Sequence, residues 1–316
     1  MEKEYTKKIS IVIPAFNEAE NLPFLCDEIT EVMSPITDEY EIIIINDGSS
    51  DKTQETVEKL FNNDSKHIVG INFRSNFGKA SAFSAGFIEA QGKIIFTMDA
   101  DLQDDPKEIP NFLAKVEEGF DLVSGWKKNR KDSFIKNTSS KFFNFVTSQL
   151  SRVKLHDFNC GFKAYKAEVA KSLDLYGQLH RYIPVMARNK GYKIGEIPVH
   201  HRKRKFGKSK YGPVRFVNGF LDLLTVMMLT KYFKRPAHFF GGIGSVALGF
   251  GFIISLYITF LRLFTGSIQN RLPLFIAGIL LVMVGVQLIS LGLIGEMFAN
   301  NYKKEDEYSK IKKIIK

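Results

Sequence analysis

The sequence predicts an α/β protein in which a mostly parallel, Rossmann-like sheet domain precedes an interfacial amphipathic helix and two transmembrane helices. Two observations predict this class. In residues 8–125, short apolar or β-branched runs alternate with amphipathic segments of helical length, which is typical of βαβ units on a parallel sheet. In residues 239–298, two apolar stretches are each long enough to cross a hydrocarbon core of about 30 Å.

The predicted strands are short, and polar stretches follow most of them. Ligands of such sheets bind beyond the carboxyl ends of the strands, so PAFNE, NDGSSD, RSNFGK and DADLQDD, which follow the first four strands, mark the expected site. The strands are expected at residues 8–14, 40–47, 67–73, 93–99 and 120–126, and the helices at residues 19–33, 52–62, 78–91 and 107–118.

The C-terminal part predicts a two-span membrane hairpin. Residues 239–264 contain a single charge, Arg262, and residues 272–298 contain only Glu296, both near the end of their span. A pair of buried core helices is the alternative, but soluble helices of this length seldom lack a polar face. Basic residues precede and follow the hairpin, whereas its connector TGSIQNR is nearly uncharged. The positive-inside rule therefore places both flanks in the cytoplasm.

These features predict that the chain has four segments and that the protein lies in a membrane. The first strand-like run is too short for a secretory signal, and two distant cysteines argue against a disulfide framework or a zinc site. We expect a protein of the inner (plasma) membrane with a cytoplasmic first domain. The parts are that domain (1–212), a juxtamembrane amphipathic helix (213–235), the hairpin (236–298) and a basic cytoplasmic tail (299–316).

The charge balance points to an anionic partner. The 316-residue chain has a net charge of +10, which suits nucleic acid, acidic lipid or phosphate-bearing substrates. Because the basic residues concentrate beside the spans and no nucleic-acid motif is present, we expect no nucleic acid. No GxGxxG follows the first strand, and Phe73 replaces the upstream glycine of a P-loop, so both of these phosphate-binding motifs are excluded.

The stretch MDADLQDDP places carboxylates directly after the fourth strand. Along an extended chain, Asp99 and Asp101 point to the same side and Ala100 is turned away. Gln103 adds a neutral amide oxygen two residues later. Carboxylates at a strand end can hold a divalent cation that neutralises a diphosphate. We therefore expect Asp99, Asp101 and Gln103 to bind a metal ion.

The next two carboxylates fit a different role. Asp104 and Asp105 precede Pro106, and proline is common in the first turn of a helix. Acidic residues at that end also interact favourably with the helix dipole. We expect both to cap the following helix.

Taken together, IVIPAFNEAENLP, IIINDGSSDKT, NFRSNFGKASAFSAGF, MDADLQDDP and HDFNCGFKAYKAEV resemble the GT-A glycosyltransferases of family 2. HHRKRKFGKSKYG and the two spans narrow the resemblance to polyisoprenyl-phosphate glycosyltransferases, such as dolichol-phosphate mannose synthases and bacterial bactoprenol glucosyltransferases. The resemblance covers residues 8–298 and implies inverting transfer of one sugar from a nucleotide-diphosphate sugar to a polyisoprenyl phosphate at the cytoplasmic membrane face. It implies Mg²⁺ or Mn²⁺ on the diphosphate. UDP-glucose and undecaprenyl phosphate are the expected donor and acceptor, ahead of UDP-GlcNAc or GDP-mannose.

Several substrate-binding residues follow from this resemblance by position. It places Pro14, Phe16 and Glu18 near the nucleotide and Asp47 at its base, and Ala100 among the substrate-binding residues. Purely structural roles are the alternative, since Pro14 can end a strand and Asp47 can cap a helix.

Two further motifs are carried over with changes. The family pattern GWRxxRxD appears as GWKKNRKD, so Lys127 keeps the charge of the first arginine but not its bidentate phosphate recognition. Arg130 is therefore the stronger expectation for a contact to the acceptor phosphate, with a solvated basic loop as the alternative. Asp157 corresponds to an acidic residue near the reacting sugar, and a loop-capping aspartate is equally consistent with the sequence.

HRKRKFGKSKYG suits a loop that closes over a diphosphate and supplies positive charge to the leaving group. Aligned from Gly207, Arg204 takes the family's arginine position, followed by Ser209 and Lys210, and Arg202 is close enough to leave the choice open. The alternative is a polybasic patch that attracts anionic lipid, beside an interfacial helix at 214–233. The expected catalytic residues are Asp101, Asp157 and Arg204.

Two other functions remain open on the sequence. A processive polysaccharide synthase would carry a QxxRW element, but the sole tryptophan of this chain, Trp126, lies outside such a motif. A non-catalytic membrane scaffold with a degenerate GT-A domain is the other alternative. The small residues of GGIGS could support helix packing between protomers, so a homo-oligomer is possible.

Overall fold

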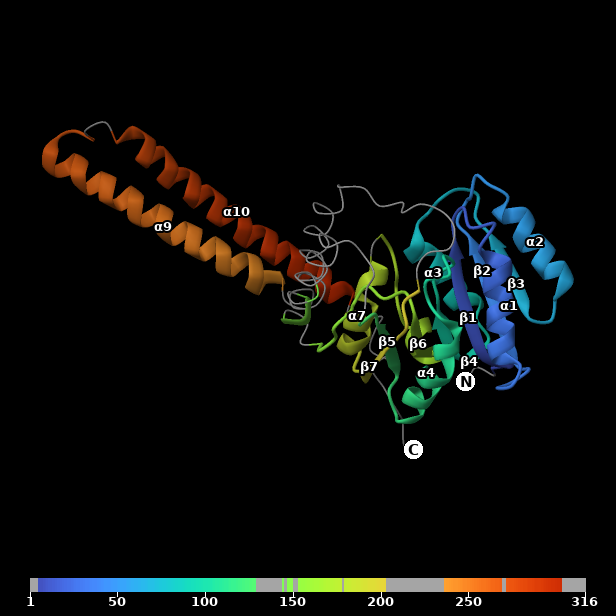
Figure 1. Ribbon diagram of the computed structural model, residues 1–316. Helices are drawn as coiled ribbons and strands as arrows, with labels where there is room; N and C mark the ends of the chain where they lie inside the picture. Colours follow the sequence, from blue (N-terminus) through green and yellow to red (C-terminus); the bar gives the residue numbers. More distant parts are fainter. Residues whose placement is uncertain are drawn as a thin grey trace. The chain divides into compact units, whose positions relative to one another are not determined.

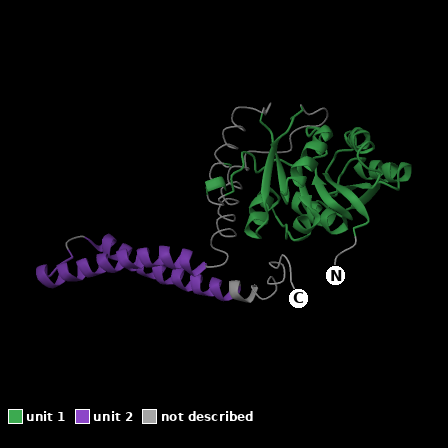
Figure 2. Cartoon of the chain, turned by 90° about the horizontal axis from the view of Figure 1, so that it is seen from below, with its two compact units in different colours: residues 1–226 green, residues 227–316 purple. Residues whose placement is uncertain are grey.

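In a computed structural model of the protein (Figure 1), residues 5–128, 144, 147–149, 153–177, 179–202, 236–268 and 271–302 are described. The chain divides into two compact units, residues 1–226 and 227–316 (Figure 2). The predicted amphipathic helix at 213–235 and most of the tail lie outside the described residues. The four-part division therefore stays a prediction.

The described part of the first unit is built on a seven-stranded sheet of order β3-β2-β1-β4-β6-β5-β7. Its strands pair in parallel, except that β6 runs antiparallel to both β4 and β5. The mostly parallel sheet expected from the sequence is confirmed. The strands are β1 (Lys7–Ala15), β2 (Tyr40–Asn46), β3 (Ile68–Asn72), β4 (Gly92–Thr97), β5 (Leu122–Trp126), β6 (Lys163–Lys166) and β7 (Ile194–Pro198).

Helices cover both faces of this sheet (Figure 1). In β2, Ile42 and Ile44 pack on the face covered by α1, α2 and α4, whereas Ile43 and Ile45 pack on the face covered by α3, α6 and α7. Burial on both faces explains why this strand reads as a continuous apolar run. The helices are α1 (Leu22–Met33), α2 (Thr53–Asn63), α3 (Lys79–Glu89), η1 (Pro106–Glu108), α4 (Ile109–Glu117), α6 (Ala167–Lys171), η2 (Leu179–Tyr182) and α7 (Ile183–Asn189).

The loops after β2 and β3 meet closely at the carboxyl edge of the sheet. Gly48 has a φ of +66°, and a Cβ atom there would lie 2.3 Å from the backbone carbon of Ser75. Only glycine fits this approach, because both the positive φ and the missing side chain are required. The two loops are thereby held against each other beside the expected ligand site.

The second unit is an antiparallel pair of long helices, α9 (Pro236–Thr265) and α10 (Leu272–Tyr302), each containing a segment long and apolar enough to cross a membrane. Glycines bring the two backbones together at matched seven-residue intervals. A Cβ atom on Gly244 would lie 2.7 Å from the Gly285 carbonyl oxygen, and one on Gly251 would lie 2.6 Å from that of Gly278. Gly244 of the GGIGS stretch is therefore used within the hairpin.

Candidate active site

Asp47 follows β2 and holds the start of α3. Its Oδ1 accepts a hydrogen bond of 2.7 Å from the backbone N–H of Phe77, and its Oδ2 accepts one of 2.9 Å from that of Gly78. Burial raises the pKa of the Asp47 carboxyl, while these two hydrogen bonds oppose that change. The carboxylate thus fixes the backbone immediately before Lys79, and the predicted contact with the nucleotide base stays a prediction.

Asp99 lies just beyond β4 and is surrounded by positive charge. The ammonium of Lys79 donates directly to its Oδ1. Burial would raise the pKa of Asp99, but Lys79 and then Lys127 lower it to about 2. On another side the carboxylate packs against Gly161, where a Cβ atom would come within 2.6 Å of all three carboxyl atoms. Asp99 is therefore an ionised carboxylate, and its close approach to Gly161 leaves no room for a side chain at position 161.

Residues 100–101 form a turn, so the extended-chain argument for the direction of Asp99 and Asp101 is wrong. Leu102, with a φ of +58° and a buried side chain, reverses the chain, and the backbone N–H of Gln103 donates to Oδ1 of Asp101 at 3.2 Å. Ala100 is buried in the hydrophobic core on the face of the sheet that α1 covers, and its predicted role in substrate binding stays a prediction. The turn was not visible in the sequence because the positive φ falls on a leucine, a residue that rarely adopts it.

Gln103 is held by His201 and Arg202, which follow β7 about 100 residues later in the chain. Its amide nitrogen lies 3.4 Å from the carbonyl oxygen of Arg202 and 3.5 Å from Nε2 of His201. The backbone of Arg202 in turn donates to the Gln103 carbonyl at 2.9 Å. The segment after β7 therefore supports the turn that carries the predicted metal ligands.

Asp104 and Asp105 have different roles. The side chain of Asp105 accepts from the backbone N–H of Lys107 and caps η1, which confirms the expected capping role. Asp104 does not cap: its carboxylate is buried, and its Oδ1 lies 2.8 Å from the Lys127 ammonium. Burial disfavours the charged form of Lys127, but Asp104 reverses this effect and the pKa is raised. The predicted contact of Lys127 with the acceptor phosphate stays a prediction.

Asp157 lies in a loop held by Glu196 of β7. Oε1 of Glu196 accepts from the backbone N–H groups of His156 at 2.9 Å and Asp157 at 3.1 Å. Nδ1 of His156 lies 2.7 Å from the other carboxylate oxygen, and its ring stacks on Trp126. Oδ1 of Asp157 accepts from the backbone N–H of Asn159, so the loop-capping role is present. A role near the reacting sugar stays a prediction.

Arg202 joins α1 to the loop before α4. Its guanidinium makes a bidentate pair with Glu28 at 3.0 and 2.9 Å and also contacts Asp105. The choice between Arg202 and Arg204 as the diphosphate contact stays open. The other expected residues of the basic segments, Arg130, Arg204, Ser209 and Lys210, lie outside the described residues.

The first-strand residues lie at the carboxyl end of β1, as expected. Pro14 is part of the strand, and the loop after it turns at Asn17, with a φ of +54°. The backbone N–H of Glu18 donates to Oγ1 of Thr53 at 2.9 Å, while its side chain accepts from Asn21. Phe16, which lies between Pro14 and Glu18 in the sequence, is half-buried. The predicted nucleotide contacts of Pro14, Phe16 and Glu18 stay predictions.

Sequence reasoning missed three basic residues near Asp99. Lys79 touches it directly, and Lys163 and His180 interact with it electrostatically. Burial lowers the pKa of both Lys163 and His180, and Lys79 adds to the effect on His180. Lys79 could have been found from the sequence, because it lies in the RSNFGK stretch that follows the third predicted strand at the expected ligand edge. Lys163 and His180 lie in segments whose fold was not anticipated.

The donor set fits a divalent cation that binds together with a nucleotide. Among the described residues, no three His, Cys, Asp or Glu side chains are grouped to hold a metal ion. Mg²⁺ in nucleotide enzymes uses one or two carboxylates, substrate phosphates and water, so a complete protein cage is not required. Asp99, Asp101 and Gln103 place hard oxygen donors in one turn at the carboxyl end of β4.

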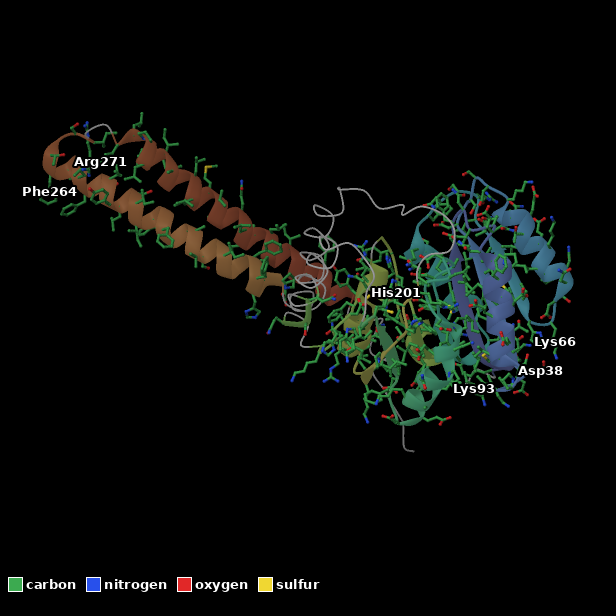
Figure 3. All side chains as sticks on the ribbon, viewed as in Figure 1. Asp38, Lys66, Lys93, His201, Phe264 and Arg271 are labelled. Atoms are coloured by element: carbon green, nitrogen blue, oxygen red, sulfur yellow. The ribbon has the colours of Figure 1, made fainter. Side chains whose placement is uncertain are left out.

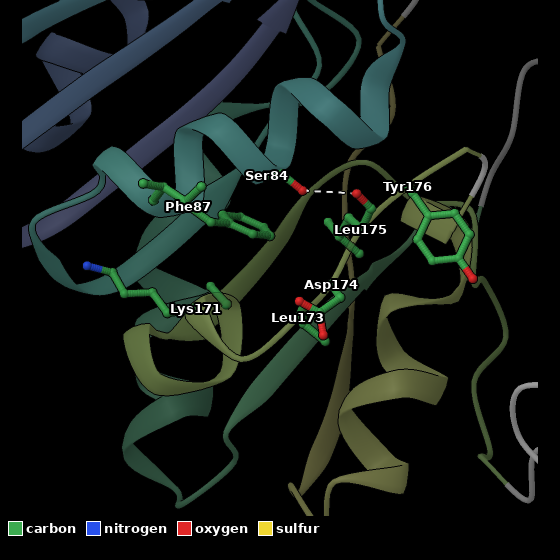
Figure 4. Close-up of a pocket in the computed structure, with 9 residues that line it drawn as sticks. Ser84, Phe87, Lys171, Leu173, Asp174, Leu175 and Tyr176 are labelled. Atoms are coloured by element: carbon green, nitrogen blue, oxygen red, sulfur yellow. Dashed lines mark hydrogen bonds between the residues drawn. The ribbon is translucent and has the colours of Figure 1, made fainter. Parts of the chain in front are cut away.

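A separate cavity of about 370 Å³ lies between α3 and the segment after α6 (Figure 4). Ser84 of α3 donates to the carbonyl of Leu175 across it, at 3.1 Å. Phe87, Leu173 and Tyr176 are among the residues that line it. None of the predicted site residues lines this cavity.

Comparison with known proteins gives a consistent result. Residues 10–174, more than half of the chain, match the family model described as Glycosyl transferase family 2. The chain is 36% identical to dodecaprenyl-phosphate galacturonate synthase of Rhizobium johnstonii over 95% of this chain and 90% of that protein. It is 34% identical to undecaprenyl-phosphate 4-deoxy-4-formamido-L-arabinose transferase of Photorhabdus laumondii, over 96% of this chain and 92% of that protein.

Solved structures support the fold. Glucosyl-3-phosphoglycerate synthase from Mycobacterium tuberculosis, in complex with Mn²⁺ and UDP-glucose, matches with a TM-score of 0.53 and 18% identity, over 71% of this chain and 79% of that chain. The same enzyme with Mn²⁺, UDP and phosphoglyceric acid matches with a TM-score of 0.54 and 16% identity, over 71% and 78%. The likeness at this identity concerns the fold, and it confirms the GT-A-like architecture expected from the sequence.

Proposed function

Because the chain belongs to glycosyl transferase family 2, we propose that it transfers one sugar from a nucleotide-diphosphate sugar to a polyprenyl phosphate at a membrane surface. One observation carries the proposal: a turn with two carboxylates at the ligand-binding edge of the sheet shares its chain with two helices of membrane-spanning length. Relatives named for transfer to dodecaprenyl and undecaprenyl phosphate match both parts of the chain.

Undecaprenyl phosphate is the proposed acceptor and UDP-glucose the first donor to test. The relatives are named for galacturonate and 4-deoxy-4-formamido-L-arabinose, so donors of those two sugars belong in the same panel. Sugar choice depends on pocket shape, and part of the expected pocket lies in residues 129–143 and 203–212, outside the described residues.

The proposed reaction is a substitution at the anomeric carbon with inversion. A phosphate oxygen of the acceptor forms the new bond, and the bond to the nucleoside diphosphate breaks with its electron pair on the leaving group. A phosphate monoester is largely ionised near neutral pH, with a second pKa of about 6, so no general base has to remove a proton. Asp157 then acts as an orienting or electrostatic residue.

The protein's main task is to bring two anions together. Asp99, Asp101 and Gln103 would hold Mg²⁺ or Mn²⁺, which supplies positive charge to the diphosphate when bound. Lys127, Arg130 and Arg204 are proposed to neutralise the acceptor phosphate and the leaving group. Such fixed charges stabilise the departing diphosphate without reorganisation during the reaction.

The proposed setting is the inner membrane, with the sheet domain in the cytoplasm. Lysine and arginine residues flank both outer ends of the hairpin, at 231–235 and 303–316, which supports this orientation through the positive-inside rule. The acceptor phosphate would then lie at the cytoplasmic headgroups.

The test uses full-length protein in detergent with undecaprenyl phosphate, Mg²⁺ and labelled nucleotide sugars, followed by extraction of the lipid. We expect label in the lipid from one donor, reduced at least about a hundredfold in Asp101→Asn because the metal loses a charged ligand. Asp38→Asn, an exposed carboxylate in the loop before β2, is the matched control and should keep full activity.

Other products would contradict the proposal. Polymer that grows beyond a single sugar would indicate a processive synthase. Absence of metal-dependent nucleotide binding would indicate a non-catalytic scaffold.

A further inference from the structure

Lys79 occupies a defined position at the start of α3. The preceding residues Phe77 and Gly78 are fixed by the buried carboxylate of Asp47, and Gly78 has a φ of +88°. From this fixed backbone the Lys79 side chain passes the Phe83 ring, with its ammonium 5.4 Å from the ring centroid, and ends on the carboxylate of Asp99. The backbone at the start of α3 therefore places the Lys79 ammonium on Asp99, an expected metal ligand.

Of the three lysines that interact with Asp99, Lys79 alone forms an ion pair with it among the described residues. Lys127 is paired with Asp104, and the ammonium of Lys163 donates to the carbonyl of Cys160. Lys79 is also the most accessible of the three, with 26% of its side chain exposed against 11% for Lys127. The pair between Lys79 and Asp99 is therefore more open to solvent than the pair between Lys127 and Asp104.

A divalent cation that binds Asp99 would have to displace the Lys79 ammonium and enter the field of Lys127 and Lys163. This repulsion would weaken the binding of the metal ion alone. A nucleotide diphosphate changes the balance, because its oxygens offer the Lys79 ammonium a new anionic partner. The metal ion and the nucleotide then favour each other's binding, which is a reciprocal coupling.

We propose that Lys79 holds the place of the divalent cation on Asp99 in the nucleotide-free protein and moves to the donor diphosphate when metal and nucleotide bind together. This inference rests on the proposed function. It assigns to Lys79 the task of keeping the site closed to free metal ions and of delivering a positive charge to the leaving group.

The test measures Mn²⁺ binding to nucleotide-free, full-length protein in detergent, by electron paramagnetic resonance of the free ion. Lys79→Met is expected to bind Mn²⁺ on the order of tenfold more tightly than the wild type, because a competing charge is removed. Lys79→Gln should shift the affinity in the same direction, and Lys79→Arg should keep the weak wild-type affinity.

Lys93→Met provides the matched control. Lys93, labelled in Figure 3, is an exposed residue near the start of β4, whereas Asp99 follows the end of that strand. Its replacement also removes one positive charge, but at the end of β4 that is remote from Asp99, and it should leave Mn²⁺ binding unchanged.

A second measurement follows UDP binding at saturating Mn²⁺. Lys79→Met should weaken UDP about tenfold, since the diphosphate loses a charged partner, while Lys93→Met should not. Tighter Mn²⁺ binding together with weaker UDP binding is a pattern that general destabilisation does not produce.

Unchanged or weaker Mn²⁺ binding in both Lys79→Met and Lys79→Gln would overturn the inference. The proposed function is tested separately, by sugar transfer to lipid in the wild type, so either idea can fail alone.

Discussion

The Lys127 ammonium lies 2.8 Å from Oδ1 of Asp104, whose side chain is completely buried. This pair links the end of β5 to the loop after β4, the two strands that flank β6 in the sheet. Removing one partner of such a pair leaves an uncompensated charge in the interior, which costs about 3–5 kcal/mol.

Lys127→Met is therefore expected to lower the stability of the sheet domain by about that amount, whatever its effect on sugar transfer. The midpoint of thermal unfolding in detergent measures it. In the double variant Lys127→Met/Asp104→Asn the buried charge is gone, so most of the loss should be recovered. A double variant no more stable than Lys127→Met would contradict the structural role of the pair.

Glu196 is expected to act as a positioning residue for Asp157. In Glu196→Ala the backbone N–H groups of His156 and Asp157 lose their acceptor, and we expect the turnover rate for sugar transfer to fall about tenfold or more. The affinity for the nucleotide should stay within about twofold, because Glu196 contacts neither of the expected metal-binding carboxylates. Glu196→Gln keeps an oxygen acceptor and should restore most of the rate. Equal turnover in Glu196→Ala and the wild type would show that the placement of Asp157 does not matter.

His180 predicts a pH dependence of stability. Burial and the charge of Lys79 lower its pKa well below the ordinary value of about 6.5, so the folded state resists its protonation. Below that pH the unfolded state takes up a proton that the folded state does not, and stability falls as the pH decreases from about 6.5. The unfolding midpoint measured between pH 5 and 7.5 should therefore depend less on pH in His180→Gln. An equally steep dependence in His180→Gln and the wild type would contradict this role of His180.

The glycine contacts of the hairpin predict a position-specific effect. Gly251→Leu would force the Gly278 carbonyl away, since even a Cβ atom would lie 2.6 Å from that oxygen, and overpacking of this kind costs about 1–3 kcal/mol. At Gly249, two residues earlier on α9, a Cβ atom would meet nothing within 4 Å among the described residues, so Gly249→Leu is the matched control. The midpoint of thermal unfolding of the full-length protein in detergent should therefore fall in the Gly251 variant and stay close to the wild-type value in the Gly249 variant. Equal midpoints in the two variants would contradict the packing of α9 against α10.

The first half of the sheet domain was predictable because each element carries its own signal. The strands at residues 8–14, 40–47, 67–73, 93–99 and 120–126 are all present in the structure, with ends shifted by at most two residues. β6 and β7 were missed, since they have four and five residues and contain polar side chains such as Lys163 and Glu196. Their pairing with β4 and β5 comes from distant parts of the chain, and no local pattern reveals it.

The family, the parallel sheet, the edge where polar residues gather and the two apolar helices could all be predicted from the sequence, because they follow from periodicity, composition and motif order. Which charged side chains form ion pairs became clear only in the folded chain. Asp104 was expected to cap a helix but pairs with Lys127, 23 positions along the chain, and the pair between Arg202 and Glu28 joins residues 174 positions apart. Ion pairs depend on distances of a few ångströms between residues brought together by folding, and such distances are not written in sequence spacing.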